Sequence, residues 1–172
     1  MTLSVIFLTN LTFYAIIPPM VDEIDREIIR LLQYDGRMPF TEIAEKVGIS
    51  ESSARRRVNQ MTSDGVLQIV GIADPQDLGW NEAGMIGISV QPDRINEVAK
   101  EIAQLPEVSY LFQVAGEFDL FAEVVCKDRQ HFVFFLNDNL QKIPGVTNTR
   151  SFLMLKMHKL SYRWGHAEPP KS

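Results

Sequence analysis

The chain has 172 residues, of which 45% are hydrophobic and 23% are charged, with a net charge of −5 and one cysteine. These proportions are typical of a globular protein of one domain or two small ones, and the lone Cys126 excludes a disulfide framework and a cysteine-based zinc cage. The acidic balance argues against nucleic-acid binding through bulk charge, so such binding requires a local basic patch. A lone thiol in an apolar run suits a reducing compartment, and we expect a cytoplasmic location.

Residues 1–20 form an apolar extension that we expect to lie outside the fold. No charged residue precedes Asp22, so the basic region that begins a signal peptide is missing. A membrane helix requires about 20 apolar residues, and this run contains polar residues and ends at Pro18-Pro19. We therefore expect no membrane partner, and we interpret Met20 as the candidate start of the protein.

The first predicted element is a helix over residues 22–34. Asp22 is a suitable N-cap, and apolar residues recur at helical spacing from Ile24 to Leu32. Asp35-Gly36 ends the helix.

Residues 41–61 predict two short helices joined by a tight turn. Gly48 tolerates the left-handed conformation at the end of the first helix, and Ser50 is a good N-cap for the second. The first helix has an apolar face, and the second repeats apolar residues at core spacing, namely Ala54, Val58 and Met61. This arrangement is typical of a helix-turn-helix, which presents its second helix to the DNA major groove.

The second of these helices carries Arg55, Arg56 and Arg57 in a row. Such a triplet is often only a solvated helix surface, but the preceding helix, the glycine turn and the serine cap favour DNA binding. Residues 20–75 contain seven Lys and Arg residues against ten Asp and Glu, a net charge of −3. Attraction to double-stranded DNA must therefore come from this small patch, with a strong dependence on salt.

The side chains of this helix suggest different contacts. Arg55 or Arg56 suits a guanine edge, and Asn59 suits adenine. Hydroxyl groups near the helix N-terminus suit phosphate. Arg57 lies beside a core position, so a structural, a phosphate and a base-reading role all remain open for it. The predicted DNA-binding residues are Ser52, Ser53, Arg55, Arg56, Arg57 and Asn59.

The rest of the chain predicts a change from helices to an α+β domain. A short strand over residues 63–73 would form a minimal wing and complete a winged helix-turn-helix domain over 21–73, followed by a linker over 74–84. Then come a strand at 85–91, a helix at 93–105, strands at 108–115 and 120–126, a helix at 128–143 and a strand at 146–160. This βαββαβ order is the ferredoxin-like arrangement, which we assign to residues 85–160, with a tail at 161–172.

Over residues 21–160 the chain resembles the Lrp/AsnC (feast/famine) family of transcriptional regulators. The matching segments are "DEIDREIIRLLQYDGR" at 22–37, "EIAEKVGIS" at 42–50, Arg57-Val58, "DGV" at 64–66, "DPQDLG" at 74–79 and "GEFD" at 116–119. The resemblance implies a winged helix-turn-helix followed by a ferredoxin-like (RAM-type) effector domain. It also implies a sequence-specific DNA-binding regulator that forms homodimers through the second domain, and often octamers.

The segment 116–119 has two interpretations. From the residues alone it is a plain hairpin turn, with Gly116 adopting a positive φ and Asp119 capping the turn. The resemblance implies instead that a small amino acid binds there, at an interface between dimers. The predicted effector-binding residues are Gly116, Glu117, Phe118 and Asp119, with Thr149 and Ser151 as weaker candidates.

Two alternatives to this regulator remain open. One is an architectural DNA-binding protein without a ligand. The other is a tetrapyrrole decarboxylase, which shares the two-domain plan of the family. An enzyme is disfavoured because His131, His158 and His166 are scattered, with no partner at metal-ligand spacing, no phosphate loop and no nucleophile motif. We therefore expect no catalytic residues, no metal and no cofactor.

Overall fold

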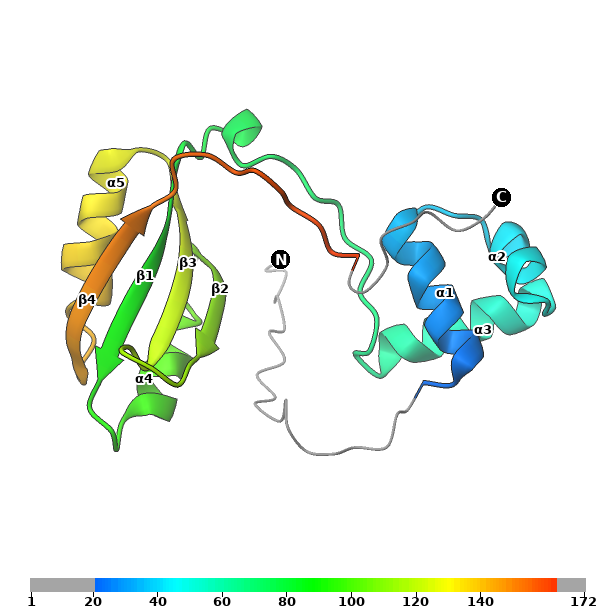
Figure 1. Cartoon of the computed structure of the whole chain (residues 1–172), viewed down its shortest axis with the longest axis horizontal. Helices are drawn as coiled ribbons and strands as arrows, with labels where there is room; N and C mark the ends of the chain where they lie inside the picture. The colour runs from blue at the N-terminus through cyan, green and yellow to red at the C-terminus, as the bar shows by residue number, and fades with distance from the viewer. Residues whose placement is uncertain (1–20, 164–172) are drawn as a thin grey trace, which may run out of the picture. The chain divides into compact units, whose positions relative to one another are not determined.

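The computed structural model describes residues 21–163, which form two compact units (Figure 1). The first unit comprises residues 21–70 together with 161–163, and the second is Gly71–Leu160. The apolar extension predicted at 1–20 and most of the predicted tail lie outside the described residues. In the part of the chain that is described, no helix is long and apolar enough to cross a membrane.

The first unit contains α1 (Glu23–Tyr34), α2 (Phe40–Val47) and α3 (Glu51–Ser63), and the predicted caps set their ends. The Asp22 carboxylate accepts the Asp25 N–H at 2.8 Å, and the Asp25 carboxylate accepts the Asp22 N–H at 3.1 Å, so α1 begins with a complete capping box. Gly48 ends α2 with φ 76°, and Ser50 Oγ accepts the Ser53 N–H at 3.3 Å to start α3. The predicted helix-turn-helix is confirmed.

A small apolar core joins these helices. Ile28, Leu31, Ile43 and Ala54 are fully buried, and each of the three large side chains contributes roughly 1.5–3 kcal/mol by leaving water. The remaining members of the core are Leu32, Met38, Ala44, Val58, Met61 and Leu67. The core therefore fixes which side of α3 faces outward.

The wing strand predicted over 63–73 is absent from the structure. Gly65, with φ 72°, turns the chain after α3, and Leu67 still packs into the core. Beyond it Ile69, Val70 and Ile72 are 51%, 68% and 59% exposed. A strand requires a neighbour for its backbone groups, and the described residues of the first unit contain no other strand. The prediction was wrong because β-branched composition alone supplies no pairing partner.

The second unit follows the predicted βαββαβ order. After a 3₁₀ turn, η1 (Gln76–Leu78), it contains β1 (Glu82–Val90), α4 (Ile95–Ile102), β2 (Val108–Gln113), β3 (Leu120–Cys126), α5 (Arg129–Phe134), the π-helical turn η2 (Phe135–Leu140) and β4 (Val146–Leu153). The sheet has the order β2-β3-β1-β4 and every neighbouring pair is antiparallel. Both helices lie on one face of this sheet (Figure 1).

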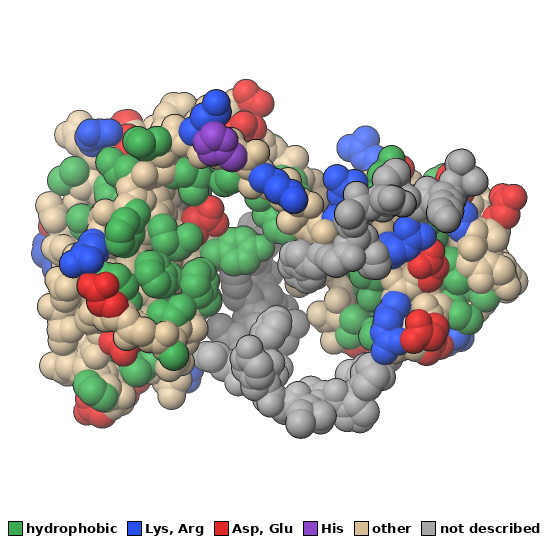
Figure 2. All heavy atoms as spheres, in the orientation of Figure 1, with side chains coloured by type: hydrophobic (Ala, Val, Ile, Leu, Met, Phe, Trp, Pro, Cys, Tyr) green, Lys and Arg blue, Asp and Glu red, His purple; other side chains and the backbone are tan. Residues whose placement is uncertain are grey.

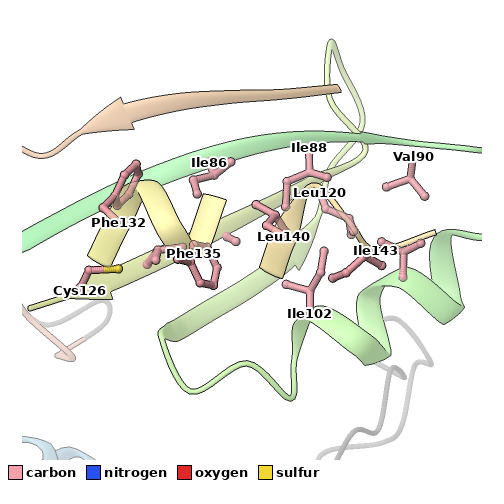
Figure 3. Packing of buried hydrophobic residues seen from close by; sticks show 13 residues of the cluster. Ile86, Ile88, Val90, Ile102, Leu120, Cys126, Phe132, Phe135, Leu140 and Ile143 are labelled. Atoms are coloured by element: carbon pink, nitrogen blue, oxygen red, sulfur yellow. The ribbon is translucent and has the colours of Figure 1, made fainter. Parts of the chain in front are cut away.

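The core of the second unit fills the space between the sheet and its helices. Ile86 and Ile88 of β1 and Leu120 of β3 point toward Ile102, Phe135 and Leu140 (Figure 3). Cys126 lies in the same cluster, and burial, followed by the nearby Glu107 carboxylate, raises the pKa of its thiol to about 11. Cys126 is therefore a buried core thiol.

Two predicted elements of this unit end differently in the structure. The helix predicted over 128–143 is α-helical only to Phe134 and continues as the π-helical turn η2 to Leu140. The strand predicted over 146–160 ends at Leu153, which pairs with Gly84 of β1. Because β1 begins at Glu82, residues 156–160 have no strand beside them to extend the ladder.

Candidate functional site

The outer face of α3 carries most of the predicted DNA-binding residues. Ser52, Arg55, Arg56 and Asn59 line one open hollow together with Ser50, Glu51, Gln60 and Ser63. Ser53 is partly buried, and its backbone N–H donates the capping hydrogen bond to Ser50 Oγ. The opposite side of α3 is anchored in the core, so this face is presented outward by a rigid helix.

Arg57 lies away from that hollow and is held by two carboxylates. Its Nη1 donates to Asp22 Oδ2 and to Asp25 Oδ1, each at 2.8 Å. The Arg57 and Asp25 side chains are 22% and 12% exposed, and the buried Arg57 Nε has no hydrogen-bond partner among the described residues. The guanidinium therefore ties α3 to the N-terminus of α1. Of the roles that the sequence left open for Arg57, this geometry favours the structural one.

The same contacts shift two pKa values. The backbone N–H of Asp25, and then the Arg57 guanidinium, hold the pKa of Asp22 below its ordinary value. The hydrogen bonds to Asp25 and Asp22 raise the pKa of Arg57. Both shifts stabilise the charged forms, so the tie persists at neutral pH.

The side-chain contacts of Arg55 and Arg56 differ from those of Arg57 and from each other. Arg55 Nη2 donates to Glu51 Oε1 at 2.8 Å, and its Cζ lies 4.6 Å from the centre of the Phe40 ring. The Arg56 side chain is exposed and has no hydrogen bond, ion pair or ring contact with any other described residue. Arg56 thus presents all its donors outward. Phe40 was not predicted, although its place at the first position of α2 could have suggested an aromatic neighbour for α3.

The loop 114–119 joins β2 to β3 and is closed by Asp119. The Asp119 carboxylate accepts the Val90 N–H at 2.7 Å, and the Asp119 N–H donates to the Ile88 carbonyl at 3.0 Å. These bonds tie the end of the loop to β1, whereas the sequence predicted that Asp119 would cap the turn 116–119 itself. The positive φ predicted for Gly116 is wrong, because the glycines with positive φ in the described chain are at 48, 65, 79 and 145. This loop is long enough to reverse direction without a left-handed residue.

Phe118 folds back from this loop onto β1. A Cβ added to Gly87 would lie 2.6 Å from Phe118 Cδ2, so only glycine leaves room for the ring. Phe118 meets Phe121 edge-on, with centroids 5.5 Å apart, and Arg150 Cζ lies 5.6 Å from its centre. Arg150 Nη1 also pairs with Glu117 Oε1 at 3.1 Å. Phe118 is buried by these contacts, which leaves Gly116 and Glu117 as the exposed residues of the predicted set.

The predicted Thr149 and Ser151 lie on the other face of the sheet. Thr149 pairs with Ile88 and Ser151 with Ile86, both of which point toward the helices. Thr149 Oγ1 accepts a hydrogen bond from Gln141 Nε2 at 2.8 Å. Arg150, between them, faces Glu117 on the side without helices. The sequence reasoning missed Arg150. The alternation of side chains along β4 could have shown that Arg150 lies on the opposite face from Thr149 and Ser151.

The face of the sheet without helices carries exposed aromatic side chains. Tyr110, Phe112 and Phe152 are 51%, 44% and 47% exposed. Phe112 stacks on Phe121 with centroids 6.0 Å apart, and Phe121 pairs with Gly87. Figure 2 shows hydrophobic side chains gathered over the strands of this face. An apolar surface of this kind marks a binding surface more often than a solvated one.

The two histidines that the structure describes, His131 and His158, lie in different surroundings. The Lys127 N–H donates to His131 Nδ1 at 3.2 Å, and His131 Nε2 lies 3.1 Å from Glu107 Oε1. This pairing ties α5 to the turn before β2. His158 is exposed in the extended segment after β4, and His166 lies outside the described residues.

Comparison with known families decides the assignment. The model of the AsnC-type helix-turn-helix domain matches residues 21–62, and the model of the Lrp/AsnC ligand binding domain matches residues 84–164. The chain belongs to the Lrp/AsnC family. The two matches correspond to the two units of the structure, and they describe transcriptional regulators and not enzymes.

Relatives and solved structures agree with this Lrp/AsnC assignment. An uncharacterized HTH-type transcriptional regulator of Pyrococcus abyssi is 36% identical over 148 residues, which are 86% of this chain and 91% of that protein. The HTH-type transcriptional regulator FL11 of Pyrococcus horikoshii is 34% identical over 81% of this chain and 92% of its own length. A Neisseria meningitidis regulator solved with L-Met has a TM-score of 0.73 and 27% identity, covering 83% of this chain and 95% of that one. The leucine response regulatory protein LrpA of Mycobacterium tuberculosis has a TM-score of 0.74 and 26% identity, covering 81% and 96%.

Proposed function

We propose that this Lrp/AsnC protein reads a specific DNA sequence as a homodimer or larger assembly, and that a small amino acid modulates its binding. The observation that carries the proposal is the outer face of α3, where Arg56 is exposed and has no partner among the described residues, beside Ser52 and Asn59. A helix-turn-helix places such a face in the major groove.

The proposed contacts follow from the chemistry of each side chain. Arg56 offers a planar pair of donors that suits guanine O6 and N7, and the amide of Asn59 suits adenine. The Ser52 hydroxyl, in the first turn of α3, suits a phosphate oxygen. Arg57 supports these contacts by fixing α3 on α1 through Asp22 and Asp25. The predicted DNA contacts thereby narrow to Ser52, Arg55, Arg56 and Asn59.

The assembly is proposed from the open face of the sheet. One helix-turn-helix reads few base pairs, and adequate specificity requires two copies on two half-sites. The exposed Tyr110, Phe112 and Phe152 give a second copy an apolar surface to cover. Dimers formed there would associate further into octamers, as the family implies.

The amino-acid effector is proposed for the loop 114–119. Gly116 is exposed, and nothing lies within 4 Å of the position of a Cβ there, so a ligand can approach the backbone closely. The Glu117 carboxylate and the Arg150 guanidinium match the ammonium and carboxylate groups of an amino acid. The solved Neisseria meningitidis relative, in complex with L-Met, supports an effector of this class. Such a ligand changes DNA binding only if it favours one assembly state.

In vitro selection of double-stranded DNA by the full chain, repeated with each amino acid, tests the proposal. We expect a selected site with two related half-sites, and we expect at least one amino acid to change the affinity or the oligomer size measured by light scattering. A pool without enrichment would contradict sequence-specific binding. A selected site that no amino acid affects would favour the ligand-independent architectural protein.

A further inference from the structure

Glu51 places a carboxylate on the face of α3 that we propose contacts DNA. It is the first residue of α3 and lines the same hollow as Arg55 and Arg56. A negative charge on a surface that approaches phosphates lowers affinity for any DNA. A role in affinity therefore does not explain Glu51.

Fold stability gives Glu51 only a small role, since a carboxylate in the first turn of α3 interacts favourably with the helix dipole, but only weakly at an exposed position. Its ion pair with Arg55 spans one helical turn, and the two side chains are 45% and 56% exposed. Exposed pairs of this kind contribute little to stability. The N-terminus of α3 is already capped by Ser50.

The contact with Arg55 gives Glu51 a different role. Arg55 Nη2 donates to Glu51 Oε1 at 2.8 Å, while the Phe40 ring, 4.6 Å from Arg55 Cζ, supports the guanidinium. These two neighbours restrict the direction of Arg55. A DNA phosphate that binds Arg55 must compete with the Glu51 carboxylate for the guanidinium. Once bound, the phosphate lies close to the negative charge of Glu51.

We propose that Glu51 is a specificity-determining residue. Its carboxylate weakens binding to arbitrary DNA, and a hydrogen bond to a G·C pair compensates for this loss of affinity. The major-groove edge of that pair offers an N4 amino donor on cytosine and the acceptors O6 and N7 on guanine. The amino group donates to the Glu51 carboxylate, and Arg55 donates to the guanine. The adjacent carboxylate and guanidinium match this edge, whereas a phosphate satisfies only Arg55. This inference rests on the proposed DNA-binding function.

The test compares wild type with Glu51→Gln in the full chain. Glu45→Gln is the matched control, because Glu45 is an exposed carboxylate on α2 that does not line the hollow. For a mixed-sequence duplex we expect Glu51→Gln to bind about threefold to tenfold more tightly, with a salt slope steeper by about one. In selection from a randomised pool it should lose the preference for G·C at one position of each half-site. The control should stay within about twofold of wild type.

The outcomes separate this inference from the function on which it rests. If wild type binds no duplex, the proposed function fails and the inference fails with it. If wild type selects a site, but Glu51→Gln keeps the same preference and the same affinity for mixed DNA, only the inference is overturned. The gain should also largely disappear in an Arg55→Ala background. A gain of the same size in that background would show general repulsion alone and contradict the pairing with Arg55.

Discussion

The helical unit and the sheet unit present opposite kinds of surface. On α3, neighbours within the same chain give each arginine a different environment. The Arg56 side chain is exposed, Arg55 is paired with Glu51, and Arg57 is bound by two carboxylates of the α1 N-terminus. The sheet unit instead leaves aromatic side chains uncovered on the face without helices. One chain therefore completes its proposed DNA-contact surface, while we propose that a second copy covers its sheet surface.

The largest expected effect comes from breaking the tie in the helical unit. Arg57→Ala leaves the largely buried Asp25 carboxylate without its cationic partner, and we expect it to destabilise the helical unit by about 1.5–3 kcal/mol. Urea unfolding of the full chain, monitored by circular dichroism, measures the change. Arg56→Ala is the matched control and should stay within about 0.5 kcal/mol of wild type. Equal stability of the two variants would contradict the structural role of Arg57.

In the sheet unit, adding a methyl group at Gly87 tests the packing of Phe118 on β1. Gly87→Ala places a Cβ against the Phe118 ring, and we expect a loss of about 1–3 kcal/mol from overpacking. Gly71→Ala is the control, since nothing lies within 4 Å of its Cβ position. Thermal unfolding of both variants checks the difference. If Gly87→Ala is as stable as Gly71→Ala, Phe118 does not depend on this close approach.

A charge on the open face tests whether that face is covered by a second copy. Phe152→Glu should raise the dissociation constant of the dimer by about tenfold or more, because a buried carboxylate would lack a partner. Gln104→Glu, an exposed position after α4, controls for the added charge. Sedimentation across a dilution series measures both. Unchanged assembly of Phe152→Glu would place the interface elsewhere.

The smallest expected effect is the pH dependence of the α1 cap. The pKa of Asp22 is lowered in the folded state, so its stabilisation is complete above the unfolded value of about 3.9 and is lost as the pH falls through the folded value. Asp22→Asn keeps an N-cap side chain but removes this titration. The stability difference between the two proteins should be constant near neutral pH and shrink in acid. A difference that persists in acid would show that the Asp22 charge is not its source.

Local sequence predicted the helical unit well because its signals are local. Asp22, Gly48 and Ser50 act through neighbours in the chain, and the apolar spacing of α3 identified its outer face. The tie of Arg57 to Asp22 and Asp25 spans more than thirty positions, so no local pattern could choose among its possible roles. The stacking of Phe40 on Arg55 is non-local in the same way.

The sheet unit was predicted in order but less well in detail. Alternating and helical apolar patterns gave the βαββαβ order, since they follow from which side chains are buried. The end of β4, like the wing of the helical unit, was overestimated because a strand requires a neighbour, which composition does not supply. The placement of Phe118 on Gly87 depends on the register of β1 and β3, and registers are set by the whole sheet.

The central claim is that the three arginines of α3 divide between contact and support, and the salt dependence of DNA binding by Arg56→Ala tests it most directly. On the duplex selected by wild type, the slope of log affinity against log salt should become shallower by about one if Arg56 binds a phosphate. If it reads a guanine, affinity should fall by about 1–3 kcal/mol and the base preference at one position should be lost. In both cases the unfolding curve should stay that of wild type. Unchanged affinity, slope and base preference would contradict the account.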